Sequence, residues 1–184
     1  RCIERRILSI LLFPMRWYVL FVLGGKETEV REILNEEYAQ ARAFIPMIEI
    51  VHRKKGESHL VQKPMFPSYV FVESTDGPAD FSTTIRKIRM RRAGIIRELK
   101  HRDVPALYES EQRYLEQMLD HEKVLRHSIG VIEGDRVIVS EGPLSGQESR
   151  IIKVDRHKRR ALLSVRLLGE QREISVSLEI IKKI

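Results

Sequence analysis

The chain has 184 residues, 42% of them hydrophobic, which excludes a disordered or fibrous protein and leaves room for one or two globular domains. Its formal charge of +7, from 33 basic and 26 acidic residues, makes a polyanion a candidate partner. The charge is uneven, because residues 15–120 carry 17 basic and 16 acidic side chains whereas residues 129–184 carry 11 and 8. We therefore expect one basic edge near the C-terminus.

The first 14 residues contain the only cysteine, Cys2, and the short apolar run 7–13 behind three arginines. A single cysteine excludes an internal disulfide framework and favours a reducing, cytoplasmic location. The run is shorter than the roughly 20 apolar residues of a membrane span and lacks the small-residue cleavage site of a signal peptide. We expect residues 1–14 to be an extension ahead of a natural start at Met15, with an amphipathic contact as the alternative, and no membrane partner.

Strand and helix patterns alternate between residues 15 and 120. We expect strands at residues 17–23, 44–52, 65–73 and 94–99, a polar hairpin region at 53–63 centred on Gly56, and helices at 26–41, 78–90 and 108–121. The strand at 17–23 has no polar break, which is typical of a central strand buried on both faces. The three helices are expected to bury the apolar residues Val30, Ile33, Leu34, Tyr38 and Ala41; Phe81, Ile85 and Ile88; and Tyr114, Leu115, Met118 and Leu119.

The helical pattern stops at residues 121–129, which we interpret as a linker, and only strand patterns follow. We expect strands at residues 137–139, 149–155, 161–168 and 172–180, with a two-residue hairpin turn at Gly169-Glu170. About five short strands in so short a segment predict a small closed barrel, because closure removes exposed strand edges.

The segment Arg156-His157-Lys158-Arg159-Arg160 concentrates four formal positive charges in a predicted turn. These charges repel one another unless solvent or an anion relieves them, and Asp155 offsets only one. Arginine bonds phosphates bidentately and stacks on unpaired bases, so an RNA hairpin or its loop is a candidate ligand. A solvated charged turn is the alternative.

The residues of this sequence do not have the spacing that known catalytic and metal-binding motifs require. A phosphate-binding P-loop would need Gly in place of Leu20 and Ser or Thr in place of Glu27. His121 and His127 are six residues apart without further nearby ligands, so no metal and no cofactor is expected. We expect no enzymatic activity; a metal-dependent nuclease using Asp135 or Asp155 is the alternative.

Three segments together resemble the NusG family of transcription elongation factors. WYVLFV near the start and FPSYVFVE after a basic loop are similar to its N-terminal domain, and Gly134–Gly146 (GDRVIVSEGPLSG) is similar to its KOW motif. The stretch KVDRHKRRALLSV most resembles the LoaP antiterminator subfamily. In the loop 141–147, we expect the glycines and Pro143 to be scaffold and Leu144 to be an anchor.

The resemblance implies an α+β protein in two domains. Residues 15–120 would form a NusG N-terminal domain with an antiparallel sheet packed with helices, residues 121–129 a linker, and residues 130–184 an all-β KOW domain of the SH3-like small-barrel type. It also implies RNA polymerase as a partner, and a monomer.

The family's binding surfaces map onto three groups of residues. Phe21, Phe66, Pro67 and Tyr69 would grip the clamp helices of the polymerase β′ subunit, with Phe66 and Tyr69 at an exposed edge beside Pro67. Ser82, Thr83 and Thr84 would touch the gate loop of the β subunit, although helix capping is the simpler role for these hydroxyls. The residues implied for nascent RNA are Lys153, Arg156, His157, Lys158, Arg159 and Arg160.

A second basic group, Arg86, Lys87, Arg89, Arg91 and Arg92, would reach non-template DNA or form a solvated helix end. The function implied is a specialised elongation factor that promotes processive antitermination after its KOW domain recognises a nascent RNA element. The alternative is a general NusG-type factor whose KOW domain binds a termination factor or a ribosomal protein.

Overall fold

The computed structural model of the protein describes residues 14–54, 56–102 and 104–184. Within these residues the chain separates into two compact units, one made of residues 14–44 and 68–107 and the other of residues 45–67 and 108–184. The expectation for residues 1–14 lies outside the described residues except at Pro14 and stays a prediction. Among the described helices, none combines the length and apolar character needed to cross a membrane.

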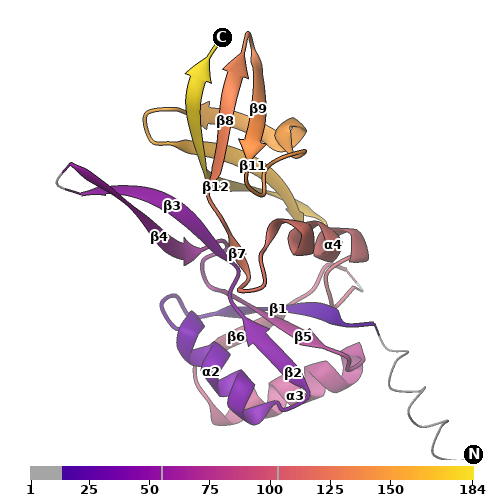
Figure 1. Cartoon of the computed structure of the whole chain (residues 1–184). Helices are drawn as coiled ribbons and strands as arrows, with labels where there is room; N and C mark the ends of the chain where they lie inside the picture. Colours follow the sequence, from indigo (N-terminus) through magenta and orange to yellow (C-terminus); the bar gives the residue numbers. More distant parts are fainter. Residues whose placement is uncertain (1–13, 55, 103) are drawn as a thin grey trace, which may run out of the picture. The chain divides into compact units, whose positions relative to one another are not determined.

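The first unit is a four-stranded antiparallel sheet with two helices. Its elements are β1 (Arg16–Val22), α2 (Glu27–Glu37), β2 (Ala41–Phe44), β5 (Tyr69–Ser74), α3 (Pro78–Arg91) and β6 (Ile95–Leu99). The strand order is β2-β5-β1-β6 (Figure 1). β1 therefore lies between two partners, and Trp17, Tyr18, Val19 and Leu20 are fully buried, which confirms the predicted central strand.

Aromatic packing holds the two faces of β1. The ring of Tyr18 stacks on Phe81 of α3 at a centroid distance of 3.8 Å, and the ring of Trp17 meets Phe44 edge-on at 4.8 Å. α3 buries Phe81, Ile85 and Ile88, as its apolar spacing predicts. Burying such side chains is the main stabilising contribution to a unit of this size.

Two predictions in this unit were wrong at element boundaries. The first helix ends at Glu37 rather than Ala41, because the side-chain amide of Asn35 bonds the backbone N–H and C=O of Ala43, at 2.7 and 3.1 Å, and so pairs with the chain after the helix. The strand expected at 65–73 begins only at Tyr69, because Ser68 has a left-handed φ of 66°.

The second unit contains two sheets and a helix. Its elements are β3 (Met47–Lys54), β4 (Glu57–Pro64), α4 (Glu109–Met118), β7 (Val124–Leu125), β8 (Ser128–Glu133), β9 (Arg136–Glu141), the 3-10 turn η1 (Glu148–Arg150), β10 (Ile151–Asp155), β11 (Arg160–Leu167) and β12 (Glu170–Lys183). The sheets have the orders β4-β3-β7 and β10-β11-β12-β8-β9. The predicted strand at 44–52 is thus two strands in different sheets, interrupted at Pro46, which cannot donate to a ladder.

The five-stranded sheet contains the expected C-terminal strands and one more. β8 pairs with β12 in parallel and overlaps residues interpreted as a linker. Two local expectations were wrong: residues 148–150 form η1 instead of strand, and the β11–β12 turn is Leu168-Gly169, both at positive φ, rather than Gly169-Glu170. Within the described residues the outer strands β9 and β10 do not pair with each other, so strand pairing does not close the barrel that we expected.

Helix α4 packs within this unit. It buries Tyr114, Leu115 and Met118, as predicted. The carboxylate of Glu111, only 3% exposed, accepts the backbone N–H groups of Leu168 and Gly169 at 3.0 and 2.8 Å. Because a buried carboxylate is costly without donors, these two bonds fix α4 against the β11–β12 turn.

Candidate nucleic-acid interface

The basic turn, defined here as Arg156–Arg160, connects β10 to β11. Its first residues are exposed, with the Lys158 side chain 73% accessible. Asp155 accepts the backbone N–H of Lys158 at 3.0 Å and lies 3.9 Å from its ammonium group. That backbone N–H is also the main reason why the pKa of Asp155 lies below its usual value. Asp155 is therefore a turn-forming residue that offsets one cation only in part.

Strand β12 holds the other end of the basic turn. The N–H of Leu178 donates to the carbonyl of Arg159 at 3.1 Å, and the Arg159 guanidinium lies 3.5 Å from the Glu179 carboxylate. Arg159 adopts a left-handed φ of 52°, which is uncommon for a side chain of its size. The turn is thus fixed by its neighbour strand in a shape that a free chain would seldom adopt.

Arg160 is partly buried at the start of β11, opposite Ser177. Its Nε atom is buried and has no hydrogen-bond partner among the described residues. A buried donor without an acceptor costs about 1–3 kcal/mol, and more when it is charged. Because Nε is not accessible, a ligand in the neighbouring hollow would meet the outer end of the Arg160 guanidinium instead.

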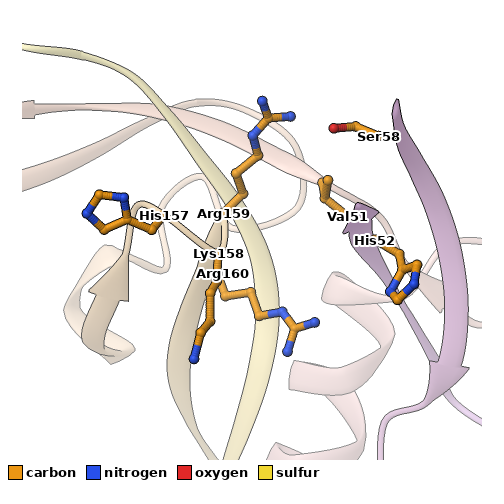
Figure 2. A pocket seen from close by; sticks show the side chains of 7 residues that line it. All are labelled: Val51, His52, Ser58, His157, Lys158, Arg159 and Arg160. Carbon is orange, nitrogen blue, oxygen red and sulfur yellow. The ribbon is translucent and has the colours of Figure 1, made fainter. Parts of the chain in front are cut away.

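The basic turn forms one wall of a hollow with a volume of about 210 Å³. Its lining residues come from the turn and from the β3–β4 hairpin: Val51, His52, Ser58, His157, Lys158, Arg159 and Arg160. Figure 2 shows the Arg159 and Arg160 guanidinium groups extending toward the hairpin side, while the His157 ring points to the other side of the turn. The structure thus brings together four of the predicted RNA-binding residues.

Two predicted RNA-binding residues lie outside this hollow. Arg156 is exposed at the start of the turn, and Lys153 is exposed on β10. Conversely, sequence reasoning did not find the hairpin residues His52 and Ser58. The only signal for them was the polar character of residues 53–63, which predicted a hairpin without indicating what it faces.

The loop ahead of β10 is built as scaffold. Gly142 has a φ of +98°, and an added Cβ would lie 2.6 Å from Ser128 Oγ and 2.7 Å from the His127 carbonyl oxygen. Leu144 is fully buried, as expected of an anchor, and its N–H donates to Ser128 Oγ at 3.3 Å. Gly142 is therefore required by backbone shape and by lack of space.

The predicted polymerase-binding aromatics fall in both units. In the first unit, Phe21 and Tyr69 pair across β1 and β5 with their rings edge-to-face at 6.0 Å, and both are partly exposed. Phe66 belongs to the second unit and is only 6% exposed, so its expected exposure was wrong, whereas the neighbouring Pro67 is exposed.

The hydroxyl residues of α3 do not cap the helix. Gly77 is the N-cap and Pro78 opens the first turn, so Ser82, Thr83 and Thr84 lie too far into the helix for the capping role that we expected. Ser82 Oγ donates to Glu98 at 2.7 Å and accepts from Lys100 at 3.1 Å. Thr83 is the exposed member of the three.

The basic run of α3 differs from the basic turn in its partners. Arg91 and Arg92 both bond the Glu37 carboxylate of α2, at 3.0 and 2.6 Å. This carboxylate also raises the pKa of Arg92. Arg86, Lys87 and Arg89 are exposed on the same helix.

No group of three or more His, Cys, Asp or Glu side chains within residues 14–54, 56–102 and 104–184 is arranged to hold a metal ion. Asp135 and Asp155, named for the nuclease alternative, flank different turns of the five-stranded sheet.

Comparison with known proteins gives one consistent result. The model of a family described as "Transcription termination factor nusG" matches residues 15–113. The transcription termination/antitermination protein NusG of Rickettsia typhi is 26% identical over 177 residues, covering 91% of this chain and 90% of that protein. Its counterpart from Vibrio parahaemolyticus is 24% identical over 176 residues, covering 92% and 96%.

Among solved structures, one titled "Domain interaction in Thermotoga maritima NusG" has a similar fold. The TM-score is 0.51 at 18% sequence identity, and the match covers 91% of this chain and 94% of that chain.

Proposed function

The chain belongs to the NusG family and is a NusG-type transcription termination/antitermination factor, and we propose that it acts in the specialised manner of the LoaP subfamily. In this proposal its C-terminal domain binds a nascent RNA element, which recruits the factor to particular operons. There it suppresses pausing and promotes read-through of terminators. The factor has no catalytic role of its own.

The basic turn is the observation that carries this proposal. The guanidinium groups of Arg159 and Arg160 line a hollow, and the side chain of Lys158 beside them is largely exposed. Guanidinium groups bind phosphate oxygens bidentately and stack on unpaired bases, which is the chemistry that an RNA loop presents. A turn held in an uncommon backbone conformation, with three cations gathered at one hollow, is better suited to binding an anion than to folding alone.

We further propose the domain boundaries implied by the family: an N-terminal domain at residues 15–120, a linker at 121–129 and a KOW domain at 130–184. The β8–β12 sheet and the tightly built Gly142 loop support the assignment of the last segment. A small SH3-like barrel is the form expected of such a domain.

The N-terminal domain is proposed to dock on RNA polymerase. The Phe21–Tyr69 ring pair supports a contact with the β′ clamp helices, because large, partly exposed aromatic side chains are common at protein-binding surfaces. Phe66 and Pro67 remain candidates for the same partner in the second unit, where Pro67 is exposed and Phe66 is buried. Thr83 is the best placed of Ser82, Thr83 and Thr84 for a gate-loop contact. Arg86, Lys87 and Arg89 remain candidates for non-template DNA.

An in vitro transcription assay tests the proposal. A template carries the leader of the operon next to this gene, followed by an intrinsic terminator, and a matched template carries the same leader sequence in scrambled order. We expect the protein to increase read-through on the first template and not on the second. Equal read-through on both templates would contradict RNA recruitment and favour a general NusG-type factor whose C-terminal domain binds a protein.

A further inference from the structure

The β3–β4 hairpin forms the wall of the hollow that faces the basic turn. It contributes Val51, His52 and Ser58, which lie about a hundred residues before the turn in the chain. Both walls belong to the same compact unit. The hairpin is also tied to the start of the five-stranded region, because β3 pairs with β7 in parallel and Glu49 accepts bonds from Arg126 at 2.7 Å and from the His127 N–H at 3.1 Å.

None of the seven described residues that line the hollow is acidic. Three of them, Lys158, Arg159 and Arg160, are permanently cationic. Two carboxylates, those of Asp155 and Glu179, form ion pairs with the first two of these cations. Asp155 is occupied by a backbone N–H, and Glu179 stands 3.5 Å from Arg159. Three cations beside two carboxylates leave a net positive charge at the hollow, which favours an anion there.

Groups that can donate hydrogen bonds line the hollow from both walls: the guanidinium groups of Arg159 and Arg160 on one side and the Ser58 hydroxyl on the other. Ser58 is exposed, and its hydroxyl lies on the wall opposite the guanidinium groups (Figure 2). A phosphate group offers several acceptor oxygens around one centre, so it can accept bonds from two walls at once, which a single carboxylate does less well.

We propose that this hollow binds one phosphate group of the RNA backbone, so that the RNA lies between the basic turn and the β3–β4 hairpin. The inference rests on the proposed function, because the turn must bind RNA for the hairpin to contribute. It adds a second RNA-contacting element from a part of the chain that precedes the C-terminal domain. Ser58 then becomes a residue that positions the RNA backbone.

Charge substitutions at Ser58 test this inference in the full chain. The probe is a fluorescein-labelled transcript of the leader next to this gene, and binding is measured by fluorescence anisotropy over a salt series. We expect Ser58→Glu to weaken binding by about 5- to 10-fold, because the new carboxylate competes with phosphate for the guanidinium groups. We expect Ser58→Lys to strengthen binding. It should also make the slope of log K against log salt concentration steeper by about 0.7–0.9, the value for one added phosphate contact on a single strand or a duplex.

Gln62 provides the matched control. It is exposed on the same strand, does not line the hollow, and lies about 13 Å along the strand from Ser58 at roughly 3.3 Å per residue. This separation exceeds the Debye length of about 8 Å at physiological salt. Gln62→Glu and Gln62→Lys should therefore change RNA affinity by less than about 2-fold. Ser58→Glu and Ser58→Lys, in contrast, should change RNA affinity in opposite directions.

The outcomes separate the two hypotheses. If substitution of the basic turn weakens RNA binding but both Ser58 variants match wild type, the hairpin contact is wrong and RNA binding by the turn stands. If neither the turn nor Ser58 affects RNA binding, the proposed function fails as well. If inorganic phosphate binds wild type and not Ser58→Glu while RNA affinity is equal in both, the hollow takes a free anion, which overturns the RNA assignment.

Discussion

Two segments of this protein, the basic run at the end of α3 and the basic turn, are almost equally basic in sequence but differ in the partners of their cations. In α3, Arg91 and Arg92 share the Glu37 carboxylate from the neighbouring helix α2. In the basic turn, Arg159 lies 3.5 Å from the Glu179 carboxylate and Lys158 lies 3.9 Å from that of Asp155. The ion pairs of the basic turn are thus longer than those of Arg91 and Arg92, and the turn cations also line a hollow.

The difference also shows in how the two segments are held. The basic turn is fixed by backbone bonds from Asp155 and β12 and lines a hollow. The other members of the α3 run, Arg86, Lys87 and Arg89, lie on an exposed helix face, where long cationic side chains keep their freedom. Binding an anion costs less conformational entropy at the prearranged site. The comparison therefore predicts that RNA affinity depends on the turn and not on total charge.

The largest effect is expected from removing the cations of the basic turn. Replacing Lys158, Arg159 and Arg160 by Ala should reduce RNA affinity on the order of 100-fold near 0.1 M salt. The slope of log K against log salt concentration should become shallower by about 2–3, because each lost phosphate contact accounts for roughly 0.7–0.9 of that slope. Anisotropy with the leader transcript measures both values.

The matched control removes an equal charge from α3. Replacing Arg86, Lys87 and Arg89 by Ala should change affinity for the leader transcript by less than about 3-fold. Similar losses from the two triple variants would mean that overall charge, and not the shape of the turn, governs binding.

A smaller effect is expected from releasing the paired arginines of α3. Glu37→Ala frees Arg91 and Arg92, so affinity for non-specific duplex DNA should rise by several-fold. The pair is largely solvent-exposed on the arginine side, so the free energy of unfolding should fall by less than about 1 kcal/mol. Heparin retention and chemical denaturation check the two expectations; unchanged retention would show that these arginines are already available to anions.

A still smaller effect is expected at Asp155. Asp155→Asn keeps a side-chain oxygen for the Lys158 N–H but removes the negative charge, so RNA affinity should rise by about 2- to 4-fold. Asp155→Ala removes the acceptor as well, and the turn should loosen. Affinity of the Ala variant equal to or above that of the Asn variant would contradict the view that turn shape matters.

The smallest effect is a local pH dependence of the turn. Because the pKa of Asp155 is depressed in the folded protein, its bond to Lys158 stabilises the turn above the unfolded-state pKa of about 3.9 and is lost as pH falls through the folded pKa. The Lys158 amide should therefore lose protection from hydrogen exchange only in that acidic range. Asp155→Asn should show no such transition, and a transition at neutral pH would contradict the assignment.

Much of the secondary structure followed from local patterns. Apolar spacing predicted α3 with Phe81, Ile85 and Ile88 inside, and alternation predicted β11 and β12. Errors occurred where a backbone conformation overrode the pattern, as at Ser68, or where a side chain of the element bonded the chain just beyond it, as Asn35 of α2 does with Ala43. The apolar pattern does not indicate which sheet a strand joins. The division of the predicted strand 44–52 into β2 and β3 at Pro46 was therefore missed.

The sequence by itself determined where the cations are, that they lie in a turn, and that Gly142 and Leu144 build the loop before it, because these depend on residue type and near neighbours. Only the tertiary structure decided which cations keep free donors. Glu37 reaches Arg91 and Arg92, and the β3–β4 hairpin reaches the basic turn, through contacts between residues far apart in the chain. Such contacts arise from the packing of whole elements, which no local pattern of residues encodes.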